Sequence, residues 1–277
     1  MAFLGTPELA VPPLRALVAA GIEVAVVVSQ PDRRRGRGAT LVPSPVKVAA
    51  LELDLPVTDQ VDAVLGAGLE LGVVVAFGRI IKPHVLASVP MVNLHFSPLP
   101  RWRGAAPVER AILAGDPRTA VDLMVVEEGL DTGGVYRRTE VDIGPDETLE
   151  ELRSRLVAAG TSMLVEELSA GLGEPLPQVG EPTYAAKLEP EERHLDWTAP
   201  ALDVHRRVRL GDAWTTHQGR RLKVWRTHVP PLGEGPQVAA ADGPVELVEV
   251  QPEGKGRMAA ADWARGARWQ PADGLGT

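Results

Sequence analysis

The stretch AFLGTPELAVPPLRALVAAGIEVAVVVS, residues 2–29, sets the class of the fold. It opens with an apolar run ending in Gly5, after which Thr6 offers an oxygen to cap a helix and Pro7 suits the first helical position. Apolar residues then recur at helical spacing, and a valine-rich run follows that is typical of a strand buried on both faces. This order predicts a β-α-β unit with a parallel sheet and a right-handed crossover. FLGTPE holds one glycine and lacks the G-x-G-x-x-G pattern, so a capped strand-to-helix turn is favoured over a dinucleotide site.

The same reading extends along the chain. Apolar runs predict further strands over 72–77, 91–96 and 120–128, and leucines at helical spacing predict a long amphipathic helix within 145–171. Residues 171–183 are rich in proline and glycine and are expected to form a linker. Beyond residue 205 short apolar runs alternate with turns, which favours a small β-rich second domain. The predicted fold is α/β, with a doubly wound, mostly parallel sheet over 1–180 and a β-barrel-like domain over 205–277.

Composition limits the classes of function. The chain has 277 residues, of which 44% are hydrophobic, so a sizeable core and more than one domain are expected. It has no cysteine, which excludes disulfides and thiolate chemistry. The net charge of −8 argues against general coating of nucleic acid. The beginning MAFLGTPELA has no basic region before a long apolar one, and no apolar run reaches the length of a membrane span, so we expect a cytoplasmic protein with no membrane partner.

Two polar residues stand in an apolar strand pattern at residues 91–96. Residues two apart share one face of a strand, so Asn93 and His95 point the same way. Pro98 and Pro100 end the strand at once, at the end where open α/β sheets bind ligands. The alternative is a buried histidine whose hydrogen bonds are satisfied inside the fold.

Asp131 adds a carboxylate to this pair. It follows the next predicted strand, among the glycines of EEGLDTGG, and we expect neighbouring strand ends to bring it to Asn93 and His95. Such a trio suits attack of an amine on a carbonyl carbon: the amide donates to the oxyanion, the imidazole holds or moves a proton, and the carboxylate orients it or accepts a proton. A metal site is a weaker alternative, because no further ligand stands at suitable spacing.

Positive charge is concentrated in PDRRRGRG, residues 31–38. Its guanidiniums suit an arm that pairs with phosphates, whereas the alternative is a solvated loop. The arginines concerned are Arg33, Arg34, Arg35 and Arg37.

Several motifs together resemble the methionyl-tRNA formyltransferases. NLHFSPLPRWRGAAP (93–107) and EEGLDTGG (127–134) carry the resemblance, and further matches run along nearly the whole chain: LGTPELA, SQPDRRRGRG, PSPVKVAA, AFGRIIKP, YAAKLEPEERHLDW, LKVW and VQPEGKGRM. The resemblance implies a formyltransferase-like Rossmann domain, an OB-like C-terminal domain that binds tRNA, and transfer of a formyl group from 10-formyltetrahydrofolate to methionyl initiator tRNA.

The resemblance also implies roles for single residues. Asn93, His95 and Asp131 match the catalytic residues of the family, and the stretch that binds folate matches Ser97, Pro98, Leu99 and Pro100. The loop that contacts tRNA matches residues 30–38, which hold Arg33, Arg34, Arg35 and Arg37. Neither a metal nor a redox cofactor is expected, because the formyl carbon is already activated on the folate nitrogen, and we expect a monomer. Two alternatives stay open: a formyltransferase acting on an amino-sugar nucleotide, and a non-catalytic RNA-binding relative.

Overall fold

The computed structural model describes residues 1–34, 41–66 and 68–276, which fold into two compact units. The first unit comprises Met1–Pro107, Thr119–Val141 and Arg153–Ala185. The second comprises Val108–Arg118, Asp142–Leu152 and Ala186–Thr277. Each unit is therefore assembled from three separate segments of the chain.

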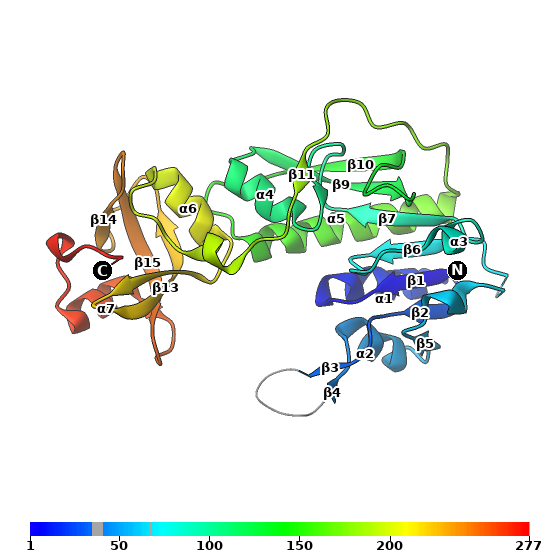
Figure 1. The fold of residues 1–277 in the computed structure, drawn as a ribbon, viewed down its shortest axis with the longest axis horizontal. Helices are drawn as coiled ribbons and strands as arrows, with labels where there is room; N and C mark the ends of the chain where they lie inside the picture. The colour runs from blue at the N-terminus through cyan, green and yellow to red at the C-terminus, as the bar shows by residue number, and fades with distance from the viewer. Residues whose placement is uncertain (35–40, 67, 277) are drawn as a thin grey trace. The chain divides into compact units, whose positions relative to one another are not determined.

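A seven-stranded sheet forms the centre of the first unit (Figure 1). Its strands, in spatial order, are β10 (Val135–Asp142), β9 (Arg118–Val125), β7 (Met91–His95), β6 (Gly72–Val75), β1 (Ala2–Gly5), β2 (Val26–Val28) and β5 (Val57–Thr58). The strands from β7 to β5 pair in parallel, whereas β9 runs antiparallel to β7. The predicted mostly parallel sheet is confirmed.

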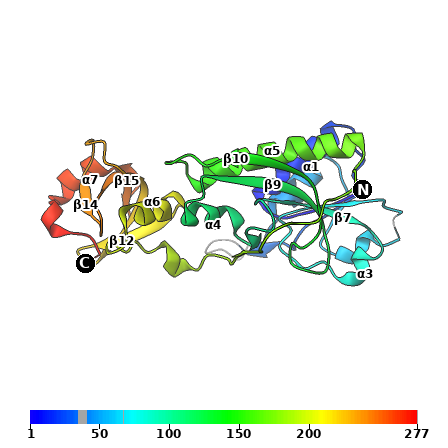
Figure 2. The same cartoon turned by 90° about the horizontal axis from the view of Figure 1, so that it is seen from above.

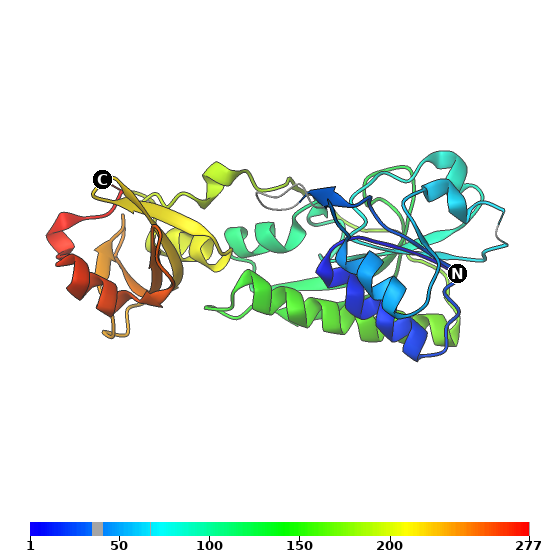
Figure 3. The same ribbon diagram turned by 90° about the horizontal axis from the view of Figure 1, so that it is seen from below.

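The sheet is wound in both directions from β1. The chain passes first to β2 and β5 on one side of β1, and then to β6 and β7 on the other. Valine-rich strands such as Gly72–Val75 are buried throughout, as a sheet covered on both faces requires. Helices α1 (Val11–Ala19) and α5 (Leu149–Ala170) cover one face, and α3 (Pro83–Leu86) covers the other (Figures 2 and 3). Helix α2 (Pro45–Glu52) precedes β5, and a short 3₁₀ turn over Val61–Val64 follows that strand.

The helix cap expected at Thr6 is wrong. The Thr6 hydroxyl donates to the carbonyl oxygen of Phe77 at 3.0 Å, just beyond β6. A 3₁₀ turn over Glu8–Ala10 intervenes, and α1 begins only at Val11, with prolines in its first turn. The hydroxyl therefore joins two neighbouring strand ends, a contact that local spacing does not reveal.

Short strand pairs also lie in the first unit, outside its main sheet. β3 (Arg33–Arg34) pairs antiparallel with β4 (Leu41–Val42), and β8 (Arg103–Gly104) pairs in parallel with β11 (Tyr184–Ala185). The β8–β11 pair matters for the site, because it draws the end of the predicted linker alongside the segment that follows β7.

The second unit holds antiparallel strands around its own apolar core. The strand order is β12 (Ala213–His217), β13 (Arg220–His228), β15 (Pro244–Pro252) and β14 (Gln237–Ala239), with β16 (Met258–Ala259) also on β15. Helices α6 (Ala201–Arg209) and α7 (Ala260–Ala267) contribute Val204, Val208 and Trp263 to the core that the strands enclose. Helix α4 (Pro107–Ala114) has all but its first residue in this unit. The predicted small β domain is confirmed.

No helix among residues 1–34, 41–66 and 68–276 is long and apolar enough to span a membrane. Within the same residues, no three His, Cys, Asp or Glu side chains gather as a metal centre would require.

A capping box starts α5. The Glu151 carboxylate accepts from the backbone N–H and the hydroxyl of Thr148, both at 2.8 Å, and also from Arg226. These bonds, those from Thr148 first, lower the pKa of Glu151 from its ordinary 4.5 to about 2. A lowered carboxyl pKa stabilises the fold above the ordinary value, and this contribution is lost as the pH falls towards about 2.

We therefore predict that Glu151→Gln lowers the melting temperature at pH 7, and that the deficit shrinks as the pH falls from 5 to 3. Thermal unfolding followed by circular dichroism at each pH measures it, with Glu181→Gln as an exposed control. An equal deficit at pH 7 and pH 3 would contradict the role of the ionised carboxylate.

Candidate active site

His95 lies at the carboxyl end of β7, in the first unit. The residue is only 5% exposed, and its Nε2 lies 3.0 Å from the carbonyl oxygen of Trp102. A carbonyl oxygen only accepts, so Nε2 carries a hydrogen and donates. This contact fixes the tautomer and leaves Nδ1 for a second partner.

Asp131 supplies that partner. Its Oδ2 lies 3.6 Å from Nδ1 of His95, and its side chain is 16% exposed. Because Nε2 is already protonated, a proton at Nδ1 makes the ring a cation facing the carboxylate. The two groups are thus arranged to take up and release one proton between them.

The segment that carries Asp131 is held by long-range bonds. Oδ2 of Asp131 accepts from the backbone N–H of Gly104 at 2.8 Å. Nε2 of Gln178 donates to the carbonyl oxygens of Asp131 and Gly133, both at 2.8 Å, while Oε1 of Gln178 accepts from Arg103. Asp131 has a φ of +53°, a left-handed conformation that costs a non-glycine residue about 1–2 kcal/mol. These bonds hold it in that conformation.

The way in which His95 and Asp131 meet differs from the sequence-based expectation. β9 is antiparallel to β7, so Val125 at the end of β9 pairs with Val92 near the start of β7. The end of β9 therefore lies at the opposite edge of the sheet from His95. The segment that follows β9 returns to His95 and is anchored there by Gly104 and Gln178.

Asn93 shares a face of β7 with His95. The residue is half-buried, between two fully buried neighbours, and pairs across the sheet with Val74 and Met124. No hydrogen bond to its side-chain amide occurs within the described part of the chain, so its N–H groups are available to a ligand. The structure thus brings His95 and Asp131 into contact and orients Asn93 with them, and the catalytic role of the trio stays a prediction.

The predicted folate turn follows β7 directly. Ser97 is fully buried, and its hydroxyl donates to the carbonyl oxygen of Arg101 at 2.7 Å, so it organises the turn from inside. Leu99 and Pro100 are buried and joined by a cis peptide bond, and Pro98 is partly exposed. The turn ends at Trp102, whose own φ is +62° and whose carbonyl receives the hydrogen bond from His95.

Sequence reasoning missed the role of residues 171–183. Gln178 donates to the backbone carbonyl of Asp131 and accepts from the side chain of Arg103. The Thr183 hydroxyl accepts from the backbone N–H of Trp102 at 2.9 Å. The segment was expected to be a linker, and its proline and glycine content gave no signal of these contacts. These contacts of residues 171–183 hold Asp131 and Trp102 in place.

The arginine arm is described only in part. Arg33 and Arg34 are exposed on β3, and Arg33 donates to the side chain of Gln30. Arg35 and Arg37 lie outside the described residues. Binding of phosphate by the arm stays a prediction.

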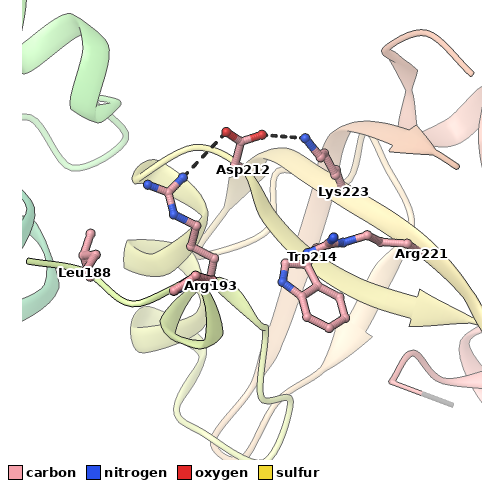
Figure 4. A pocket seen from close by; sticks show the side chains of 7 residues that line it. Leu188, Arg193, Asp212, Trp214, Arg221 and Lys223 are labelled. Carbon is pink, nitrogen blue, oxygen red and sulfur yellow. Dashed lines mark hydrogen bonds and ion pairs between the residues drawn. The ribbon is translucent and has the colours of Figure 1, made fainter. Parts of the chain in front are cut away.

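A hollow of about 390 Å³ opens on the second unit (Figure 4). Arg193 and Lys223 reach Asp212 from two sides, at 3.6 Å and 2.6 Å, and the bond from Lys223 holds the pKa of Asp212 below its ordinary value. The guanidinium of Arg221 lies over the ring of Trp214, 4.1 Å from its centre. The hollow therefore combines several cations with a partly exposed indole ring.

Two family models match the chain. The model described as formyl transferase matches residues 1–168, and the model described as formyl transferase, C-terminal domain, matches residues 187–268. The fold, with its site at the end of β7, is thus that of the formyl transferases.

Relatives of known name identify the family more closely. A methionyl-tRNA formyltransferase of Jannaschia sp. is 45% identical over 97% of this chain and 97% of its own length. One from Symbiobacterium thermophilum is 42% identical over 95% of this chain and 91% of its own length. The chain belongs to the methionyl-tRNA formyltransferase family.

Solved structures share the fold at low identity. A methionyl-tRNA formyltransferase from Clostridium thermocellum superposes with a TM-score of 0.62 at 17% identity, covering 92% of this chain and 98% of that one. An N-formyltransferase from Helicobacter canadensis, solved with folinic acid and dTDP-3-aminofucose, gives 0.68 at 16% identity, covering 91% and 98%.

We predict that His95→Ala and Asp131→Asn each lower kcat for formyl transfer by ~10²–10⁴, the range for groups that hold or move a proton. Asp131→Asn keeps an oxygen for the Gly104 N–H, so the loop stays anchored. If the residues act as a unit, the double variant loses less than the product of the two single losses. Single-turnover kinetics measure this, and a near-normal kcat in either single variant would remove that residue from the site.

Proposed function

We propose that this chain transfers the formyl group of 10-formyltetrahydrofolate to the amino group of methionyl initiator tRNA, for translation initiation. The identity of up to 45% with methionyl-tRNA formyltransferases over nearly the whole chain supports the acceptor. The contact between His95 and Asp131 carries the chemistry, because it offers a proton-exchanging pair at the strand end where the donor would bind. The folinic acid of the Helicobacter canadensis structure supports a folate donor.

The proposed reaction forms one C–N bond and breaks another. The neutral amine of the methionyl group attacks the formyl carbon, and the carbonyl oxygen becomes an oxyanion. The Asn93 amide donates to that oxyanion and stabilises the transition state. The bond between the formyl carbon and N10 of the folate then breaks, leaving formylated tRNA and tetrahydrofolate.

One proton must move during these steps. The amine nitrogen loses a proton on forming the new bond, and N10 gains one as it leaves. The His95–Asp131 pair is placed to hold this proton at Nδ1 between the two events, because Nε2 is occupied by Trp102. The pair ends in its starting state, as a catalyst must.

Cationic groups on both units support a nucleic-acid acceptor. Arg33 and Arg34 are exposed on β3, and the hollow of the second unit presents Arg221 and Lys223 beside Trp214. Cations with an aromatic surface are the usual means of binding phosphate backbones and unpaired bases. We also propose that the chain acts as a monomer in the cytoplasm.

A comparison of acceptors tests the function. The chain is incubated with labelled formyl donor and, separately, with charged initiator tRNA, charged elongator tRNA and an amino-sugar nucleotide. We expect label in the initiator tRNA at the highest kcat/KM. Preferred transfer to the amino sugar would overturn the proposed acceptor, and RNA binding without any transfer would leave the non-catalytic alternative.

The arginine arm gives a separate prediction. Replacement of Arg33 and Arg34 by alanine removes two guanidiniums from exposed positions outside the His95 site. We expect kcat/KM for charged tRNA to fall and its dependence on salt to flatten by about one phosphate per lost contact. Measurements of kcat/KM against salt concentration, wild type beside variant, check this. Parallel salt slopes would show that these two arginines are solvated and do not contact tRNA.

A further inference from the structure

A buried ion pair supports the turn that follows β7. Asp122 lies on β9 with no exposed surface, directly opposite His95 in the strand register. Arg138 on β10 reaches it from the neighbouring strand and keeps about a third of its side chain exposed (36%). Neither residue takes part in the proton transfer described above.

The contacts of this pair converge on one backbone position. Arg138 donates from Nε to Oδ1 of Asp122 at 2.7 Å and from Nη2 to Oδ2 at 2.6 Å. The same Nη2 donates to the carbonyl oxygen of Leu99 at 2.6 Å, and the N–H of Leu99 donates to Oδ2 of Asp122 at 2.9 Å. Both polar groups of Leu99 are therefore held by the pair.

The turn also has bonds within itself, and the Thr183 N–H donates to the Pro100 carbonyl oxygen at 3.2 Å. Leu99 also donates to the carbonyl of Ser97 at 3.1 Å, and Arg101 donates to that of Pro98 at 3.0 Å. Such short-range bonds shape a turn but leave its place against the sheet undetermined. Asp122 and Arg138 belong to two strands of the sheet, so their bonds to Leu99 tie the turn directly to the sheet.

The cost of this arrangement indicates that it serves more than stability. Burial raises the pKa of Asp122, and the hydrogen bond from Arg138 opposes that rise. The same hydrogen bond raises the pKa of Arg138. A buried ion pair is often no more stabilising than apolar residues of similar size, so stability alone does not account for a charged pair at this position.

We propose that Asp122 and Arg138 are positioning residues for the formyl donor: they fix the turn Ser97–Pro100 against the sheet in the geometry that binds it. This proposal rests on the proposed function, in which that turn binds the folate. The pair acts through the Leu99 backbone and does not touch the reacting atoms.

The pair is tested by four variants, which are Arg138→Met, Arg138→Lys, Asp122→Asn and the double variant of Asp122→Asn with Arg138→Met, and by one control. Arg138→Met removes both the ion pair and the bond to the Leu99 carbonyl. Asp122→Asn keeps an oxygen for the Leu99 N–H, and the double variant leaves no unpaired charge. The control is Arg137→Met. Arg137 immediately precedes Arg138 on β10 but pairs with Glu166 and Glu167 on α5.

The expected result is a split between KM and kcat. KM for 10-formyltetrahydrofolate should rise at least ~10-fold in Arg138→Met and in the double variant, the equivalent of about one hydrogen bond to a charged group. We expect kcat at saturating donor to fall much less, because His95 and Asp131 remain, and Arg137→Met should keep both constants. Arg138→Lys should restore KM only in part, because an ammonium lacks the planar fork that reaches Asp122 and Leu99 together.

Stability separates positioning from a purely structural role. The single variant Arg138→Met leaves a buried carboxylate unpaired and should melt at a lower temperature, whereas the double variant should recover much of that loss. A double variant with recovered melting temperature and a still-raised KM supports positioning. Recovery of both would overturn the proposal and make the pair structural only.

Binding of tetrahydrofolate, measured by calorimetry, makes the proposal independent of the acceptor. If the wild type binds tetrahydrofolate but formylates no tRNA, the proposed function fails while the dissociation constants of the variants still test the pair. Unchanged dissociation constants in Arg138→Met and in the double variant would overturn the positioning role even if formylation proceeds.

Discussion

The antiparallel register between β7 and β9 is the constraint on which the site depends. It sets His95 opposite Asp122, which places a fully buried carboxylate behind the edge of the sheet that carries His95. It also sends the end of β9 away from that edge, so the chain must return before Asp131 can face His95. The bonds from Gly104 and Gln178 hold the loop that carries Asp131 in its returned position.

Backbone groups contribute as much to the site as side chains do. His95 is oriented by the Trp102 carbonyl and Asp131 by the Gly104 N–H, and both partners lie in the short segment after the turn Ser97–Pro100. Trp102 and Asp131 themselves adopt left-handed backbone conformations. Strained backbone persists where surrounding bonds determine it, here those of Thr183 and Gln178. The site is therefore preorganised by contacts between segments far apart in sequence.

Much of the fold followed from periodicity alone. Apolar runs and leucines at helical spacing predicted β1, β2, β6 and β7 and the long helix α5, because burial on both faces or along one stripe leaves a direct mark on sequence. Partners leave no such mark. Nothing in the spacing showed that β9 is antiparallel, that the Thr6 hydroxyl bonds to Phe77, or that Gln178 in a proline-rich stretch holds the Asp131 loop.

The candidate site, like the fold, was predictable where a residue pattern alone carries the information and not where it depends on a distant partner. Alternation along the strand placed Asn93 and His95 on one face, and the glycines around Asp131 marked an irregular, close-packed loop. Asp122 was not predicted to matter, because it is a single charged residue in an otherwise apolar strand. Such a residue indicates a buried ion pair only when its charged partner is known, and sequence does not show that Arg138 is the partner. Arg138 sits in an alternating strand beside Arg137, and sequence does not distinguish the arginine that turns inward from the one that pairs with Glu166 at the surface.

The two aspartates around His95 are separated in role by their surroundings. Both oxygens of Asp122 are taken up by Arg138 and the Leu99 N–H, and the carboxylate has no exposed surface. Protonation there would sacrifice bonds that hold the turn, so Asp122 is unsuited to exchange protons during turnover. Asp131 instead receives one backbone N–H, faces Nδ1 of His95 and remains 16% exposed, so the proposed reaction assigns the approach of the substrate amine to this side. In the proposed reaction, one carboxylate is thus fixed to position the backbone, and the other responds to the substrates.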